Sequence, residues 1–152
     1  MRKTYRFRCL MLDGRRMEEN QHRDYVRQAI HVRDLQKSAA FYETILGLKR
    51  MPDPFKDGRH VWFRMGSRDQ LHLIGGATEV AKQDLNAHPS FRVPSLEDFV
   101  TRLDQAQVKY VNSMGEERKL TVRPEGVKQV YFQDPDGYWI ELCAPQRYGL
   151  IQ

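Results

Sequence analysis

Apolar and polar residues alternate along two stretches of the chain that match each other. Each stretch has two strand-like runs separated by a turn, which lies at residues 66–69 in the first and at residues 134–137 in the second. The runs are VWFR at 61–64 and LHL at 71–73, and VYFQ at 130–133 and IEL at 140–142. This pattern predicts a β-hairpin in each stretch. Both runs keep one offset of 69 positions, so His72 and Glu141 occupy equivalent positions on equivalent strands.

A strand and a helix are predicted ahead of each hairpin. In the first half the strand covers residues 25–32, and Asp34 caps a helix that ends at Gly47. In the second half the strand covers residues 90–93, and Ser95 caps a helix. The two caps are offset by 61 positions, so the order of elements is the same in both halves.

The repeat predicts an α+β fold of two βαβββ modules. Module 1 covers about residues 25–76 and module 2 about residues 88–144, within a single domain over residues 25–144. The offset between equivalent positions of the two halves is 61 at the helix caps and 69 at the hairpins. The second half therefore has eight additional residues between helix and hairpin, in a polar stretch around 113–126. We expect this stretch to be a loop over the space that the sheet encloses. Neither module can cover both faces of its own sheet, so the two must pack together or against another chain.

Size and charge exclude several classes of protein. A chain of 152 residues with 40% hydrophobic residues can bury one core. It has no apolar run near the roughly 20 residues that a membrane span needs. Residues 1–24 form a basic arm with seven Lys or Arg against four acids, and they account for most of the net charge of +5. Without a reading motif, such an arm indicates a solvated segment, or a strand added to a sheet edge, rather than a nucleic-acid surface.

Cysteine content indicates a reducing compartment. Cys9 and Cys143 suggest neither a disulfide framework nor a cysteine metal site, and each is expected to be a small buried residue or an inert thiol. The arm lacks the apolar run of a secretory signal. We therefore expect a cytoplasmic protein, with residues 145–152 as a C-terminal tail.

Two segments resemble a known family. Residues 29–48 contain VRDL, FY and LGL, and residues 134–142 are DPDGYWIEL. In this order, with the repeat between them, they resemble the opening and closing segments of vicinal-oxygen-chelate proteins, which include glyoxalase I, bleomycin-binding proteins and extradiol dioxygenases. The resemblance covers residues 25–144 and implies that the paired modules form a cupped, partly open, barrel-like sheet with one divalent metal ion inside.

The resemblance also implies where the metal ligands lie. In the family they come from the first and last strand of each module, and the matching positions here are Arg27, His72, His88 and Glu141. A guanidinium offers no lone pair, so the expected ligands are His72, His88 and Glu141. Two imidazoles and a carboxylate suit Zn²⁺ or Ni²⁺ first and Mn²⁺ or Fe²⁺ second, with positions left open for a substrate.

The function implied by the resemblance is a glyoxalase-like lyase or isomerase, which acts on a small substrate with vicinal oxygens through an enediolate-type intermediate. Glu141 would be a ligand or the catalytic base. Arg27 and His31 share one strand face and would bind an anionic group of the substrate.

The resemblance also allows two other functions, and it implies a dimeric assembly. A metal-free, antibiotic-type binding protein is favoured by the positive charge of Arg27 beside the site. An Fe²⁺-dependent extradiol dioxygenase would take its first His from the position of Arg27. Family members usually pair, so a homodimer is expected. Because His72 lies in one module and His88 and Glu141 in the other, the site could take ligands from two chains.

Overall fold

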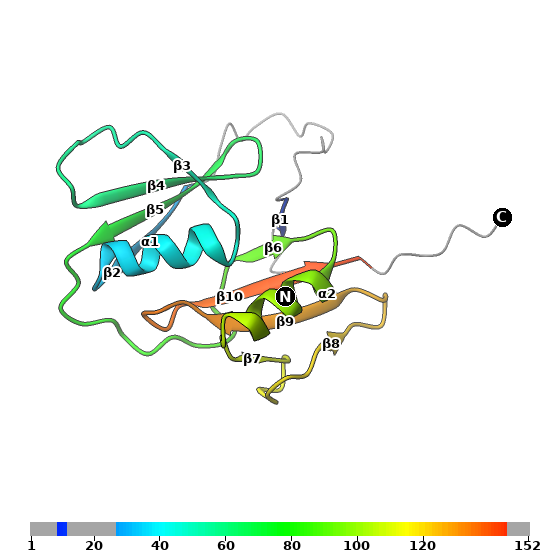
Figure 1. Cartoon of the computed structure of the whole chain (residues 1–152). Coiled ribbons are helices and arrows are strands. Elements are labelled where there is room, and N and C mark those ends of the chain that lie inside the picture. Colours follow the sequence, from blue (N-terminus) through cyan, green and yellow to red (C-terminus); the bar gives the residue numbers. More distant parts are fainter. Residues whose placement is uncertain (1–8, 12–26, 146–152) are drawn as a thin grey trace, which may run out of the picture.

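The computed structural model describes residues 9–11 and 27–145 (Figure 1). Two helices and ten strands are present in these residues. In chain order they are β1 Cys9–Met11, β2 Arg27–Val32, α1 Leu35–Thr44, β3 Lys49–Met51, β4 His60–Met65, β5 Asp69–Gly75, β6 Ser90–Arg92, α2 Leu96–Gln105, β7 Tyr110–Val111, β8 Thr121–Val122, β9 Lys128–Gln133 and β10 Trp139–Ala144.

The strands form two sheets with the same internal order. Module 1 has the order β2-β5-β4-β3, and module 2 has the order β6-β10-β9-β7, with β8 also paired to β9. In both modules the first strand is parallel to the last, and the last is antiparallel to the one before it. The α+β fold of two βαβββ modules is therefore confirmed, as two separate sheets that are not closed into a barrel.

The register of the strands confirms the sequence repeat. His72 pairs with Ala29 on one side and Trp62 on the other. Glu141 pairs with Ser90 and Tyr131, which lie at the offsets of 61 and 69 from those two residues. His72 and Glu141 thus occupy the same place in their sheets.

Both helices begin at the predicted caps. The Asp34 carboxylate accepts a hydrogen bond from the Lys37 backbone N–H at 2.9 Å, and the Ser95 hydroxyl accepts one from the Asp98 N–H at 3.2 Å. These bonds satisfy backbone donors that the first turn of a helix leaves without partners. The helix α1 ends at Thr44, earlier than predicted, and the chain turns through Gly47 at a φ of 68°.

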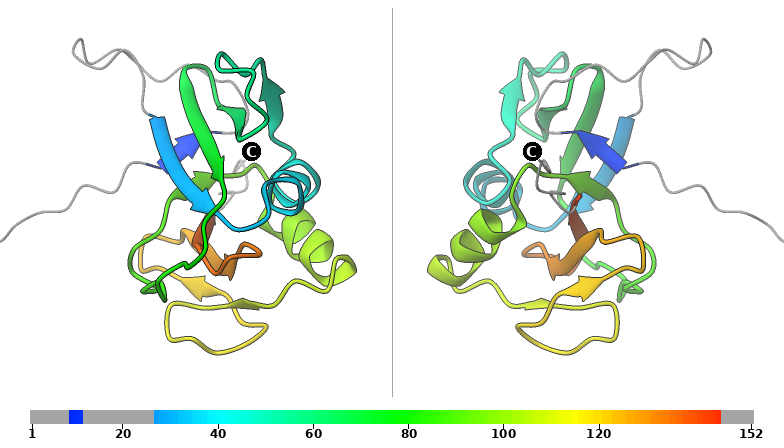
Figure 2. Two further views of the ribbon diagram at one scale, coloured as in Figure 1. Left: turned by 90° about the vertical axis from the view of Figure 1, so that its left-hand side faces the viewer. Right: turned by 90° about the vertical axis from the view of Figure 1, so that its right-hand side faces the viewer.

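The helix-facing sides of both sheets share one core. It includes Leu73 and Phe63 from module 1 and Leu142 and Phe132 from module 2. Figure 2 shows α1 and α2 side by side, and the Arg102 guanidinium of α2 donates to the backbone carbonyl at the end of α1 at 2.9 Å. The modules are therefore joined through their helical layers.

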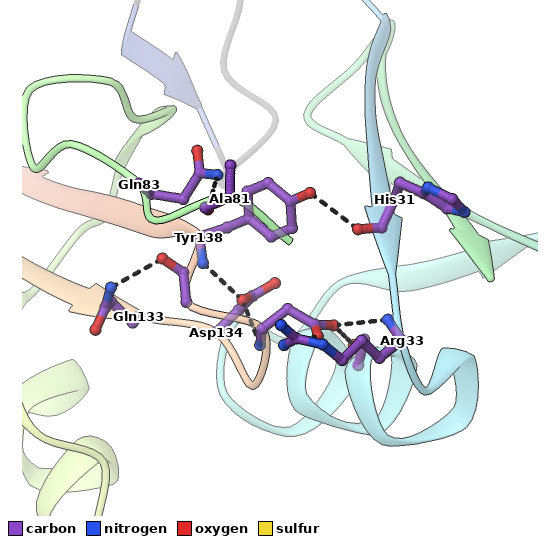
Figure 3. A network of polar contacts seen from close by, with 10 residues as sticks. His31, Arg33, Ala81, Gln83, Gln133, Asp134 and Tyr138 are labelled. Atoms are coloured by element: carbon purple, nitrogen blue, oxygen red, sulfur yellow. Dashed lines mark hydrogen bonds and ion pairs between the residues drawn. The ribbon is translucent and has the colours of Figure 1, made fainter. Parts of the chain in front are cut away.

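The turn between β9 and β10 also joins the modules (Figure 3). The Tyr42 hydroxyl of α1 donates to the buried Asp134 carboxylate at 3.0 Å, and Arg33 pairs with Asp136 at 3.1 Å. The Tyr138 hydroxyl donates to the backbone carbonyl of His31 at 2.9 Å. The predicted turn is present, and its side chains fix module 2 against module 1.

Two predictions outside the repeat have different outcomes. The stretch at 113–126 was expected to be a loop, but it contributes β8, which pairs antiparallel with β9 because its Thr121 and Val122 can extend the ladder. The arm does add a strand to a sheet edge, since β1 pairs in parallel with β6. The rest of residues 1–26 and residues 146–152 lie outside the described part of the chain. Neither described helix is long and apolar enough to cross a bilayer.

Candidate functional site

Strand alternation sends the candidate ligands away from the shared core. Val61 and Phe63 point into the core, so Trp62 and, on the neighbouring strand, His72 lie on the opposite face of the sheet of module 1. We call this side of each sheet its open face. In module 2 the core residues Ile140 and Leu142 likewise place Glu141 on the open face.

Glu141 lies at the centre of a hydrogen-bond cluster. One carboxylate oxygen accepts from the Ser90 hydroxyl at 2.7 Å and from the Gln129 amide at 2.9 Å, and the other lies 3.0 Å from His88 Nε2. Glu141 is 7% exposed, and Ser90 and Gln129 are equally buried. A carboxylate this buried would be costly without such donors.

The same contacts determine the charges of the pair. Burial raises the pKa of Glu141, but the hydrogen bonds from His88, Ser90 and Gln129 outweigh it, so the pKa is lowered. Burial lowers the pKa of His88, but the hydrogen bonds to Glu141 and to the Leu85 carbonyl raise it overall. Both shifts favour the charged forms, so a protonated His88 and an ionised Glu141 would form an ion pair at this distance.

His72 has a different environment on module 1. Its ring stacks on Trp62 with centroids 3.6 Å apart and planes at 11°, and His60 lies 5.0 Å away. Burial, then the positive charges of His60 and Arg27, lowers the pKa of His72. His72 Nε2 is buried and has no hydrogen-bond partner among the described residues. The ring is thus a neutral imidazole with an unused nitrogen.

Arg27 and His31 occupy the same open face on β2. Both side chains are exposed. The Arg27 guanidinium carbon lies 5.4 Å from the centre of the Trp62 ring. In module 2 the equivalent position holds His88, which reaches Glu141 instead.

One chain brings together two of the three expected ligands. His88 and Glu141 are in contact, but His72 is not within ligand distance of both. Among the described residues, Asp53, Asp57 and His60 are the one group of three whose ligand atoms all lie within 4.8 Å of one another. The separation of His72 follows from the fold, because it belongs to the other sheet.

The chemistry of the three expected ligands suits a divalent metal ion, although one chain does not bring all three together. His88 Nδ1 contacts the Leu85 carbonyl, which holds the ring so that Nε2 points at the Glu141 carboxylate. His72 has a buried imidazole nitrogen that no other described residue contacts by a hydrogen bond. Two imidazoles and one carboxylate form a common set for Zn²⁺ and similar ions.

Sequence reasoning missed the residues that surround these ligands. Ser90, Gln129 and Tyr131 support Glu141, and burial together with the charge and hydrogen bond of Glu141 raises the pKa of Tyr131. The repeat carried a usable signal, since the offset of 69 relates Tyr131 to Trp62. Each candidate ligand on a last strand therefore has an aromatic neighbour at the equivalent position of its module.

Two curated relatives are similar to this chain in sequence. "Uncharacterized protein YwbC" of Bacillus subtilis (strain 168) is 27% identical over 120 residues, covering 74% of this chain and 90% of that protein. "Glyoxylase I 4" of Arabidopsis thaliana is 26% identical over 117 residues, covering 73% of this chain. The match spans 64% of the length of the Arabidopsis protein.

Solved structures share the fold. "Oxidase ChaP-H2" superimposes with a TM-score of 0.68 at 20% identity, over 85% of this chain and 98% of that one. Lactoylglutathione lyase from Agrobacterium tumefaciens superimposes with a TM-score of 0.60 at 20% identity, over 82% and 95% of the two chains. A sequence model of one family matches residues 24–142. Together with the paired modules, this match shows that the chain belongs to the Glyoxalase/Bleomycin resistance protein/Dioxygenase superfamily.

Proposed function

We propose that the protein is a metal-dependent, glyoxalase-like lyase or isomerase that acts on a small substrate with vicinal oxygens. The observation that carries this proposal is the buried His72 Nε2, which has no hydrogen-bond partner in the part of the chain that the structure describes. A buried polar nitrogen of this kind is costly unless something binds it, and an imidazole lone pair is a preferred metal ligand. His88 and Glu141 supply the other two ligands, and Zn²⁺ or Ni²⁺ is the expected ion.

The proposed site is shared between two copies of the chain. His72 lies on the open face of module 1, and His88 and Glu141 lie on the open face of module 2. Within one chain the two modules are joined through their helices. A homodimer that places module 1 of one copy against module 2 of the other completes the ligand set.

The residues around the site have separable roles. Ser90 and Gln129 hold the Glu141 carboxylate in place, and their donated hydrogen bonds keep it ionised. The lowered pKa of Glu141 favours the role of ligand over that of a strong base while these bonds persist. Arg27 and His31 bind an anionic group of the substrate. The bound ion supplies Lewis acidity toward the pair of substrate oxygens.

A metal-free binding protein is the second candidate. The specific observation in its favour is that His88, Ser90 and Gln129 already satisfy Glu141 without any ion. The fixed positive charge of Arg27 would also oppose a cation beside it.

Metal content decides between the two candidates. Purified wild-type protein should contain stoichiometric metal, and Glu141→Gln should weaken binding by about 100-fold or more because the offsetting charge is lost. Glu117→Gln is the matched control, since Glu117 is exposed and pairs with Lys109 in another part of module 2. Elemental analysis measures the metal content of each purified protein, and calorimetric titration measures its metal affinity. Iron as the native ion would favour the dioxygenase chemistry instead.

Arg27→His provides the complementary test. It restores a fourth ligand position, so an enzyme should bind metal more tightly and lose turnover, because the anion anchor and the open position disappear together. A wild type without metal that gains metal in Arg27→His would support the binding protein and contradict the lyase.

A further inference from the structure

The open face of module 1 carries more aromatic surface than metal ligation requires. Trp62 stacks on His72, and the Phe55 ring lies 6.3 Å from Trp62, 6.5 Å from His72 and 4.7 Å from His60. Phe55 is 58% exposed although it contacts these three rings. The face therefore presents several π surfaces around one point of the sheet.

Trp62 has a second unsatisfied polar atom beside that of His72. The indole Nε1–H is buried and has no hydrogen-bond partner among the residues that the structure describes. An indole nitrogen only donates, so the group that would satisfy it must be an acceptor. Buried tryptophans usually have such a partner, so among the described residues this N–H remains available to an oxygen of a ligand.

Positive charge lies on one side of the same rings, whereas the carboxylates of Asp53 and Asp57 lie beside His60 on the other side. The Arg27 guanidinium stands over Trp62 at 5.4 Å, with no carboxylate partner among the described residues. Arg64 is exposed and follows Trp62 on the same face of β4. A guanidinium held over a ring can bind an anion through its N–H fork while its plane remains against the aromatic surface.

We propose that this face binds a planar aromatic carboxylate. Arg27 binds the carboxylate, Phe55 and the edge of the Trp62–His72 stack contact the aromatic ring, and Trp62 Nε1–H donates to a ligand oxygen. The inference rests on the proposed function only in taking the open face of module 1 as the substrate surface. It adds the substrate class, because chelation of vicinal oxygens does not itself require an aromatic ring.

Phe55 offers the route by which such a ligand reaches Trp62. The indole nitrogen is shielded from water, so some side chain must move. Phe55 lies in the connection between β3 and β4, where residues 54–59 are all exposed. Moving this segment breaks few buried contacts and therefore costs little compared with opening the core.

The test follows the indole N–H signals of metal-free protein during titration with salicylate. The chain has two tryptophans, so the ¹H–¹⁵N spectrum contains two indole signals, and Trp139→Phe assigns them. Salicylate should shift the Trp62 signal downfield and saturably as the new hydrogen bond forms, while Trp139 stays in place. Lactate has a carboxylate and a neighbouring hydroxyl but no ring, and it should cause no saturable shift at the same concentrations.

Variants separate the contributions of charge and hydrogen bond. Arg27→Gln should weaken salicylate binding about tenfold or more, through loss of a charge-assisted hydrogen bond. Trp62→Phe keeps an aromatic ring but removes the donor, and should weaken binding severalfold. Arg118→Gln is the matched control and should leave affinity unchanged, because Arg118 pairs with Asp104 in module 2. Salicylate that shifts neither indole, or lactate that binds as tightly, overturns the inference.

These outcomes are distinct from those of the metal experiment. Metal-loaded protein with no salicylate response of Trp62 would leave the proposed lyase standing and reject the aromatic substrate class. A clear Trp62 response in a wild type that never holds metal would support the aromatic substrate class and reject the proposed lyase. The two results can be obtained separately, because salicylate is titrated into protein from which a chelator has removed any metal.

Discussion

The contact between His88 and Glu141 gives module 2 a stable state without metal. The two side chains are each about nine-tenths buried and lie 3.0 Å apart, and Ser90 and Gln129 complete the carboxylate's hydrogen bonds. A metal ion would have to displace the His88 proton and replace this ion pair. Metal binding is therefore expected to strengthen as pH rises, since protons compete for the imidazole nitrogen.

The ion pair predicts a pH window for stability in metal-free protein. The lowered pKa of Glu141 gives stability that is present above its ordinary value of 4.5 and is lost as pH falls through the lower folded-state value. The raised pKa of His88 gives stability that is present below 6.5 and is lost as pH rises through the higher folded-state value. His88→Gln should therefore lower the free energy of unfolding most between about pH 5 and 6.5.

Urea denaturation in the presence of a chelator, repeated across pH, measures this window. The double variant His88→Gln/Glu141→Gln is the control, because it lacks both charges and the pair's contribution to the pH dependence should vanish. An effect of His88→Gln that stays constant from pH 5 to 9 would show that the pair is not ionised in the folded protein.

At the scale of elements, the β9–β10 turn connects the two modules through hydrogen bonds. Asp134 accepts hydrogen bonds from the backbone N–H groups of Asp136 and Tyr138 and from the buried Tyr42 hydroxyl of α1. The turn residues Asp134 and Asp136 were recognisable from sequence, but their contacts to Tyr42 and Arg33 connect residues about 100 positions apart. One short turn thus shapes its own hairpin and anchors the first helix.

Loss of the Tyr42 hydroxyl should weaken this connection between the modules. Tyr42→Phe leaves one oxygen of the buried Asp134 carboxylate without its donor, which should lower the free energy of unfolding by about 1–3 kcal/mol. Tyr138→Phe is the control, since its hydroxyl bonds the His31 carbonyl at an exposed position and should contribute about 1 kcal/mol or less. Equal effects in the two variants, measured by urea denaturation, would contradict a role for burial.

At the scale of the whole molecule, the packing of the helices keeps the candidate ligands of the two open faces apart within one chain. Because both helical layers share one core, His72 and the His88–Glu141 pair remain on separate sheets of one chain. A second copy is the simplest way to complete the proposed ligand set. Trp62 and Arg27 would then line the same space as Tyr131.

Mixing two inactive variants tests this shared site. His72→Ala and Glu141→Gln should each lack metal when purified alone. In a mixed dimer one site carries both changes and the other carries neither, so unfolding and refolding the two together should restore metal to about half of the dimers. Elemental analysis of the purified dimer fraction provides the measurement. No recovery in a mixture that has formed dimers would place the whole site within one chain.

The sequence alone determined the features that depend on local physics. Strand alternation, the Asp34 and Ser95 caps and the β9–β10 turn depend on residues a few positions apart, so their patterns were visible without a structure. The repeat related His72 to Glu141 because both modules keep the same register. The departure at Arg27 was visible for the same reason.

Only the tertiary structure decided which side chains meet. The ion pair of His88 with Glu141, the stack of His72 on Trp62 and the core between the helices depend on distances between segments far apart in the chain. Such distances follow from the packing of whole elements, in which many weak contacts are optimised together. A sequence pattern can therefore identify candidate ligands and the strand faces on which they lie. It cannot reveal that the ring nitrogens of Trp62 and His72 lack hydrogen-bond partners among the described residues, because this depends on how the rings pack.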